Sequence, residues 1–156
     1  MLEQTAIDMG LNKEEKYKQL VPQIIALLDE KDEIARQANF CSALKYGMNF
    51  LWVGFYKVKE NELILGPFQG PVACTRILKG KGVCGLAWAK KQTIIVDDVS
   101  LFPGHISCSS LSKSEIVLPV FDDSGNVKLV LDIDSDKLKT FDKTDEKYLS
   151  ELLKLI

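Results

Sequence analysis

The chain has 156 residues, of which 46% are hydrophobic and 27% charged, and its formal net charge is −2 at pH 7. Twenty lysine and arginine residues against 22 acidic ones leave no excess of positive charge to follow a phosphate backbone, so no nucleic-acid partner is expected. The absence of a signal-peptide pattern and of a long apolar run predicts one cytoplasmic domain over residues 1–156, not a membrane protein, with four cysteines that are reduced at rest.

Two helices are expected near the N-terminal end, over about residues 12–48. Apolar residues recur at helical spacing in the first, Asn12 and Glu15 form a capping pair at its start, and Pro22 lies inside it, where proline can introduce a kink. The second helix begins near Asp32. It is predicted to bury one stripe of side chains, namely Ile34, Ala38, Cys41, Leu44 and Met48.

The middle of the chain, over about residues 50–135, is typical of strands joined by turns and loops. Aromatic and β-branched residues favour strands at 50–58, 63–65, 93–96, 115–121 and 127–133, with a short extra segment at 72–78 and a short helix at 83–90. A loop rich in glycine and proline, GPFQGP, precedes that segment. Residues 97–112 form a long loop, and such loops inside a compact domain are usually functional or mobile.

A last helix is expected over about residues 142–156. Asp142 caps it, and its apolar residues fall on one side, namely Leu149, Leu152, Leu153 and Ile156. Few connections in the chain are long enough for parallel strand pairing. The predicted fold class is therefore α+β, with a central antiparallel sheet and helices packed on it.

The string Gly80-Lys81-Gly82-Val83-Cys84-Gly85 matches the GxGxxG pattern of dinucleotide-binding proteins. That motif requires a βαβ unit and an acidic residue about 20 positions later, whereas hairpins flank this string and Asp97 and Asp98 come too early. We interpret the glycines as a turn into the short helix. The cysteines contain no CxxC pair, so neither a zinc site nor a thioredoxin-type motif is indicated. No metal site and no cofactor are expected.

One strand predicts an aromatic site. Trp52, Gly54 and Tyr56 share a face because strand side chains alternate. Two large rings on either side of a residue without a side chain predict a notch that suits a small polar ligand with an apolar or cationic part. Ordinary core packing is the alternative, and by themselves these three residues favour it.

The hairpin around the sequence DDSGN gathers acidic residues. A two-residue turn at 124–125 places Glu115 opposite Asp134, with Asp132 on the same face, whereas a turn one residue earlier pairs Glu115 with Asp132. Clustered carboxylates repel unless a cation joins them or one holds a proton. The cluster predicts a site for a ligand ammonium or, alternatively, a solvated strand end neutralised by lysines such as Lys113 or Lys128.

Two further cysteines fall on loops. Cys108 lies in the long loop, three residues after His105, which could help to form its thiolate, and Cys74 follows the loop that is rich in glycine and proline. Thiols on flexible loops can come close enough for a sulfenic acid to resolve into a disulfide. Unreactive cysteines and a histidine satisfied within its loop are the alternative. Cys41, on an apolar helix stripe, is expected to be a small buried side chain.

Six segments carry a family resemblance: in order, WVGFY, LGPFQGPVACTRI, GKGVCG, FPGHISC, SEIVLPV and LDIDS. From about Ala35 to the C-terminus the chain resembles the free methionine-R-sulfoxide reductases, enzymes built on a GAF domain. The spacing of Cys74, Cys84 and Cys108 matches the three cysteines of that family. A GAF sensor would share the fold but would not need these cysteines together with GPFQG and FPGH.

The resemblance implies a GAF fold and the thioredoxin-dependent reduction of free L-methionine (R)-S-oxide to L-methionine by a cytoplasmic homodimer without a cofactor, as part of an oxidative stress response. Cys108 would attack the sulfoxide sulfur and become a sulfenic acid. Cys74 would then form a disulfide with Cys108, which thioredoxin would reduce, and Cys84 would have a supporting or alternative role.

The same resemblance assigns the substrate pocket. The pocket aromatics of the family match Trp52 and Tyr56, and its substrate-binding carboxylates match Glu115, Asp132 and Asp134. We expect Glu115 to protonate the sulfoxide oxygen, and the two aspartates to hold the ammonium of a free amino acid. The main alternative is a non-catalytic GAF module that binds an amino-acid-like ligand as a sensor. A structural partner within a multidomain protein is less favoured, because the predicted domain fills the chain.

Overall fold

The computed structural model describes residues 6–156, so residues 1–5 of the predicted domain lie outside it. Four α-helices lie in this part of the chain: α1 (Lys13–Leu27), α2 (Glu33–Met48), α3 (Gly82–Lys90) and α4 (Lys143–Leu153). A 3₁₀ turn, η1, covers Val99–Leu101 in the predicted long loop. The strands are β1 (Trp52–Lys59), β2 (Glu62–Gln69), β3 (Arg76–Leu78), β4 (Ile94–Val96), β5 (Ser114–Phe121) and β6 (Val127–Ser135).

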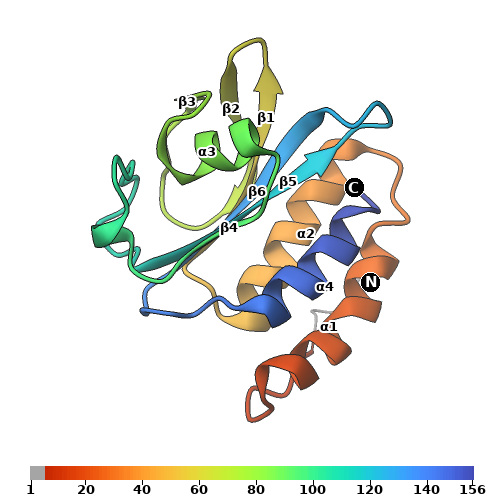
Figure 1. The fold of residues 1–156 in the computed structure, drawn as a ribbon. Coiled ribbons are helices and arrows are strands. Elements are labelled where there is room, and N and C mark those ends of the chain that lie inside the picture. Colours follow the sequence, from red (N-terminus) through yellow and green to blue (C-terminus); the bar gives the residue numbers. More distant parts are fainter. Residues whose placement is uncertain (1–5) are drawn as a thin grey trace.

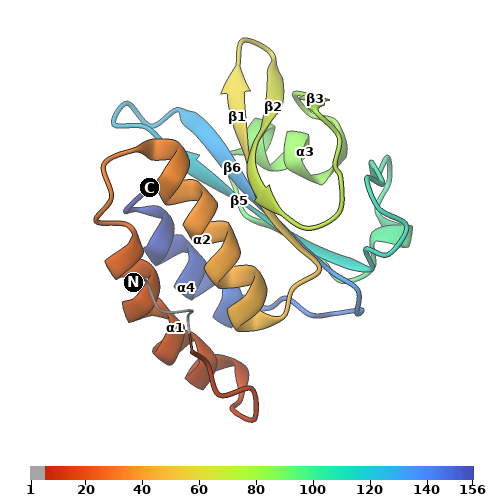
Figure 2. The same cartoon turned by 180° about the vertical axis from the view of Figure 1, so that it is seen from behind.

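The strands form one six-stranded sheet in the order β3-β2-β1-β6-β5-β4, and each neighbouring pair is antiparallel. Figures 1 and 2 show α1, α2 and α4 together on one face of this sheet and α3 on the other. The predicted α+β class with a central antiparallel sheet is confirmed. No helix within residues 6–156 is long and apolar enough to cross a bilayer.

Strand alternation sorts the side chains into two cores. Phe55 in β1, Leu118 in β5 and Leu131 in β6 pack with the three long helices and are essentially inaccessible. On the other face Tyr56 and Val117 pack with residues of α3. The acidic residues of the last hairpin lie in the same alternating rows as this second core, so the fold directs them towards α3.

The helix starts follow the predicted caps, but the buried stripe of α2 is shifted. Asn12 and Glu15 form the expected capping box of α1, and the side chain of Asp32 accepts a hydrogen bond from the backbone at the start of α2. Ile34 is 69% exposed, so its predicted burial is wrong. At about 100° per residue it lies roughly 80° around the helix from Leu44, in the first turn, at the margin of the buried face.

Strand β2 continues through part of the predicted GPFQGP loop, as far as Gln69. The outer neighbour β3 pairs only with residues 62–64 of β2, so Pro67 lies where no outer strand needs its missing N–H group. At the register shift between Gly54 and Tyr56, β2 carries one extra residue relative to β1. The extension brings the chain to Cys74 on the α3 side of the sheet, where β2 ends above the second core.

Candidate active site

Three carboxylates meet where β5 and β6 pair. Glu115 lies opposite Asp134, and Asp132 follows two residues away on the same face. This is the register predicted for a turn at 124–125, although the turn has a different form. The loop runs over residues 123–125 with Gly125 at a φ of 78°, and a bulge at Val120/Phe121 restores the expected pairing.

The carboxylate cluster is buried. Glu115 is 5% exposed and Asp132 is 7% exposed, and Asp134 is partly buried. Lys128 instead donates to the Ile156 carbonyl oxygen at 3.1 Å, and the ion pairs found within residues 6–156 include neither Lys113 nor Lys128. The alternative of a solvated strand end neutralised by lysine is therefore excluded.

Two polar side chains contact the cluster, and one buried oxygen of the cluster has no hydrogen-bond partner within the described residues. The Ser112 hydroxyl donates to Asp134 Oδ1 at 2.5 Å, and His105 Nε2 lies 3.3 Å from Glu115 Oε2. Asp132 Oδ1 is buried and has no hydrogen-bond partner within the described residues. A buried acceptor without a partner costs about 1–3 kcal/mol, so this oxygen is poised to receive a donor from a ligand.

Burial and mutual repulsion raise the pKa of all three carboxyl groups. For Glu115, burial is the main cause and the charge of Asp134 adds to it, which raises the pKa to about 8. Burial also raises the pKa of Asp132, with Glu115 as the next cause, and that of Asp134, with Asp132 as the next. The cluster therefore retains a proton at neutral pH and can donate it to a ligand.

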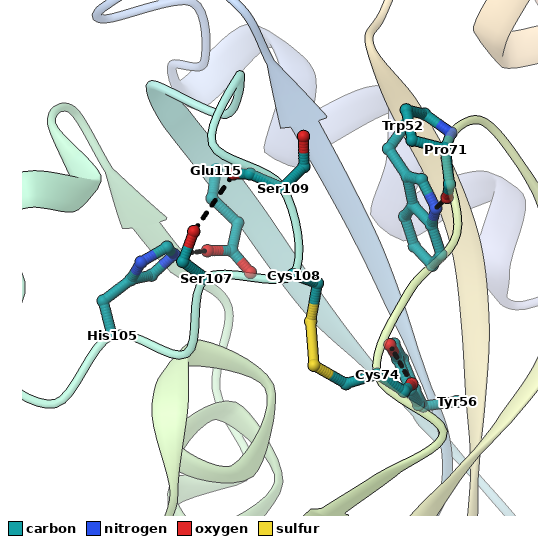
Figure 3. The surroundings of a disulfide bond; sticks show 9 residues. All are labelled: Trp52, Tyr56, Pro71, Cys74, His105, Ser107, Cys108, Ser109 and Glu115. Carbon is teal, nitrogen blue, oxygen red and sulfur yellow. Dashed lines mark hydrogen bonds and ion pairs between the residues drawn. A yellow bond between two sulfur atoms is a disulfide. The ribbon is translucent and has the colours of Figure 1, made fainter.

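A disulfide joins the two loop cysteines. Cys74 and Cys108 are 34 residues apart in sequence, and their Cα atoms are 5.7 Å apart. Figure 3 shows this disulfide beside Glu115, with the hydroxyl of Tyr56 donating to the Cys74 carbonyl oxygen at 2.9 Å. Cys108 is exposed and Cys74 half-buried. The disulfide thus joins the long loop to the segment after β2, on the side of the sheet where the second core lies.

His105 contacts the carboxylate cluster in this structure. The sequence suggests a role for it in forming the Cys108 thiolate, but the ring nitrogen of His105 contacts Glu115, as Figure 3 shows. Ser112 is a further member of the site that no sequence pattern singles out. Its hydrogen bond reaches Asp134, 22 residues away, and depends on how the end of the long loop folds against β6.

The aromatic residues form a wall of the site without the predicted notch. A Cβ atom added to Gly54 would lie 2.6 Å from the Cβ of Phe68 and would overlap the Trp52 ring, so the space over the glycine is filled. The Trp52 indole stacks on Phe68 and donates to the Pro71 carbonyl oxygen at 3.0 Å. The missing side chain of Gly54 therefore leaves the space that the indole of Trp52 occupies. The centroids of the Trp52 and Tyr56 rings are 6.1 Å apart.

Most of the predicted site residues line one small cavity. Its lining includes every predicted site residue except Cys74 and Cys84, together with His105 and Ser112. The cavity has a volume of about 30 Å³, which is room for one or two water molecules. In the disulfide form the site is assembled, but its cavity is too small for an amino acid.

Cys84 lies next to the carboxylates and is not part of the disulfide. It is the third residue of α3 and is 4% exposed. Its sulfur and one oxygen each of Glu115 and Asp132 all lie within 4.8 Å of one another. Burial, and then the negative charges of Asp132 and Glu115, raise the pKa of the Cys84 thiol. This thiol is therefore protonated at neutral pH and is a poor nucleophile.

Known proteins resemble this chain in fold and in sequence. The model of the GAF domain family matches residues 27–156. The GAF domain-containing protein A of Dictyostelium discoideum is 60% identical over 158 residues, which cover 100% of this chain and 99% of the relative. The free methionine-R-sulfoxide reductase of Saccharomyces cerevisiae is 43% identical over 156 residues, which cover 94% of this chain and 87% of the relative.

A solved structure agrees with these relatives. The free methionine-R-sulfoxide reductase of Neisseria meningitidis, in complex with its substrate, is 50% identical with a TM-score of 0.92. The match covers 97% of this chain and 92% of that one. The chain therefore belongs to the GAF domain family and, within it, to the free methionine-R-sulfoxide reductases.

Proposed function

We propose that the protein reduces free L-methionine (R)-S-oxide to L-methionine through the thiols of Cys108 and Cys74. The observation that carries this proposal is a disulfide whose Cys108 lines the same cavity as a buried, proton-holding carboxylate cluster. A sensor would need a ligand pocket but not this thiol pair. The two similar reductases named above act on the same class of substrate, which supports the choice.

In the first step the Cys108 thiolate attacks the sulfoxide sulfur. The attack forms a bond between the two sulfurs, and the proton of Glu115 goes to the sulfoxide oxygen. The resulting hydroxyl group moves to the Cys108 sulfur as the substrate's sulfur–oxygen bond and the bond between the two sulfurs break, so that methionine leaves and Cys108 becomes a sulfenic acid. The sulfoxide sulfur is reduced by two electrons, and Cys108 is oxidised by two. The raised pKa of Glu115 supports this role, because a carboxyl group with an ordinary pKa would have no proton to give at neutral pH.

In the second step Cys74 resolves the sulfenic acid. Its thiol gives up a proton and attacks the Cys108 sulfur, the hydroxyl group of the sulfenic acid leaves with that proton as water, and the disulfide forms. The hydrogen bond from Tyr56 to the Cys74 carbonyl oxygen supports this assignment, because it holds the backbone of the resolving cysteine against the pocket. A dithiol then attacks the disulfide and returns both cysteines to the thiol form. Cys84, buried and outside the disulfide, keeps a supporting role in this scheme.

Asp132 and Asp134 bind the substrate ammonium in this proposal. The unpartnered oxygen of Asp132 supports the assignment, because an ammonium group supplies the missing donors and the missing positive charge. A peptide nitrogen carries no charge, so a peptide-bound methionine sulfoxide would leave the cluster uncompensated. Trp52 and Tyr56 contact the apolar part of the substrate from the opposite wall.

The size of the cavity implies an order of events. The disulfide form leaves room for one or two water molecules, so the loop that carries Cys108 has to move outward before substrate can enter. Reduction of the disulfide frees that loop. Each turnover thus alternates between an open dithiol form that binds the sulfoxide and a closed disulfide form that excludes it.

The remaining assignments rest on the family resemblance. We propose thioredoxin as the dithiol that reduces the disulfide, a homodimeric assembly without a cofactor, a cytoplasmic location, and a role in the oxidative stress response. Neither a nucleic acid nor a membrane is a partner in this scheme.

The test is thioredoxin-coupled oxidation of NADPH, with the R and S forms of free methionine sulfoxide supplied separately. We expect turnover of the R form only, and its loss in the Cys108→Ser variant. Cys41→Ser is the matched control, because Cys41 is a buried thiol in the other core and its variant should keep its activity. If the wild type bound the R form without turnover, and the binding survived in Cys108→Ser, the sensor would replace the enzyme.

A further inference from the structure

A buried thiol and two buried carboxyl groups converge from three elements of the fold. Cys84 comes from α3, Glu115 from β5 and Asp132 from β6, and each side chain is less than 10% exposed. The sulfur and one oxygen of each carboxyl group all lie within 4.8 Å of one another. The scheme above uses the two carboxyl groups for substrate but gives Cys84 no chemical step.

The polar side of this group is incomplete. Asp132 Oδ1 has no hydrogen-bond partner in residues 6–156. Within the same part of the chain, His105 is the one basic side chain that makes an ion-pair contact with Cys84, Glu115 or Asp132, and it contacts Glu115. Carboxyl groups buried without a compensating cation are unfavourable. The substrate ammonium would reach Asp132 from the cavity, but Cys84 is not among the residues that line that cavity. The sulfur of Cys84 is a weak hydrogen-bond acceptor for an ammonium group, whereas as a thiolate it is a strong ligand for a thiophilic metal.

We propose that Cys84, Glu115 and Asp132 form a binding site for a thiophilic divalent metal ion, of which Zn²⁺ is the physiological representative. Zinc binds thiolate and carboxylate ligands at about 2.3 Å and about 2.0–2.2 Å, distances that reach across a group of this size after small side-chain rotations. Three protein ligands leave a fourth position for water or for the neighbouring His105. Mg²⁺ and Ca²⁺ prefer oxygen ligands alone and are not expected to bind.

The binding step is an exchange of ions without electron transfer. The sulfur–hydrogen bond of Cys84 breaks, its proton and the proton held by the carboxyl groups leave to solvent, and a metal–sulfur bond forms while the oxidation state of the metal stays unchanged. The bound ion supplies the positive charge that Asp132 and Glu115 lack. Cys41 offers no comparable site, because its sulfur is hydrogen-bonded to the Pro67 carbonyl oxygen at 3.4 Å.

A direct test uses Cd²⁺, which reports a metal–thiolate bond by its ultraviolet charge-transfer absorption. The full-length Cys74→Ser/Cys108→Ser variant keeps Cys84 and Cys41 as its thiols. We expect an absorption band that saturates at one Cd²⁺ per chain and that Zn²⁺ displaces. The band should vanish when Cys84→Ser is added and persist when Cys41→Ser is added. Asp132→Asn should weaken Cd²⁺ binding by roughly tenfold or more.

Other results would overturn the metal site. These are the absence of a band in the folded double variant, a band that survives Cys84→Ser, and a band that Zn²⁺ cannot displace. Circular dichroism of each variant checks that it is folded. If Asp132→Asn alone leaves the affinity unchanged, the proposed ligand set is wrong.

The site also predicts competition with substrate, and this consequence rests on the proposed function. Methionine (R)-sulfoxide should raise the apparent dissociation constant of Cd²⁺ in the double variant, because its ammonium and the metal share Asp132. The S form is the matched control for chelation of Cd²⁺ in solution. A Cys84-dependent band with no competition by the R form would contradict the proposed substrate position and leave the metal site standing.

Discussion

Glu115 and Asp134 lie directly opposite each other across strands β5 and β6, and this pairing positions the whole candidate site. It places two carboxyl groups side by side in a buried environment, with Asp132 next to them on the same face. Their repulsion makes it unfavourable to ionise all of them. The fold thereby stores a proton beside an oxidisable thiol, which is the combination that sulfoxide reduction requires.

The stored proton predicts a pH dependence of the reaction. Glu115 acts as an acid, so kcat/KM should be high while Glu115 is protonated and should fall as the pH rises through about 8. The Glu115→Gln variant should lose this descending limb and roughly 10²-fold or more in activity, since glutamine keeps the shape but has no acidic proton. Steady-state rates with the free R-sulfoxide from pH 6 to about 10 test both points. A descending limb that persists in Glu115→Gln would assign it to another group.

The same carboxyl group predicts a cost in stability. Its pKa is about 8 in the folded protein against an ordinary value of 4.5, so the folded state binds more protons than the unfolded state between these values. The free energy of unfolding should therefore decrease as the pH rises from about 4.5 to about 8. Glu115→Gln should flatten this slope and be more stable than the wild type at pH 8, while being less active. Urea denaturation at several pH values measures the free energy of unfolding of both proteins. A slope that is unchanged in Glu115→Gln would contradict the raised pKa of Glu115.

Much of this arrangement was predictable from sequence, because it follows from local rules. Strand alternation places Asp132 and Asp134 on one face, and the residue types around DDSGN predict a tight hairpin. The register survives the unexpected form of the turn because the bulge opposite Val120/Phe121 accommodates one extra residue, Lys128, in β6. The capping box at Asn12 is equally local.

Other parts of the site depend on contacts between segments that are distant in sequence. The position of the Trp52 ring over Gly54 depends on Phe68 from the neighbouring strand, which the sequence pattern does not place. The contact of His105 with Glu115 and that of Ser112 with Asp134 depend on the path of a long loop without regular spacing. Periodicity carries no information about such a path, so these contacts required the structure.

Asp132 predicts selectivity between free and acylated substrates. In Asp132→Asn the charged partner of the substrate ammonium is lost, so KM for the free R-sulfoxide should rise by roughly 10- to 100-fold, the equivalent of about 1.5–3 kcal/mol for a hydrogen bond to a charged group. The N-acetylated sulfoxide, which has no ammonium, should change much less. Steady-state kinetics with both substrates measure the ratio. Wild-type kinetics of Asp132→Asn on the free form, or an equal loss on both forms, would remove Asp132 from ammonium binding.

The disulfide should make the oxidised protein more stable than the reduced one. Cys74 and Cys108 are 34 residues apart, and closing a loop of this length removes about 3–4 kcal/mol of chain entropy from the unfolded state. The two redox forms should therefore differ in the free energy of unfolding by up to this amount. Cys74→Ser should abolish the difference, whereas Cys84→Ser should keep it, because Cys84 is outside the disulfide. Denaturation of each form, with and without reductant, tests this. Equal stabilities would mean that the disulfide restricts the folded chain as much as it restricts the unfolded chain, and would contradict stabilisation by loop closure.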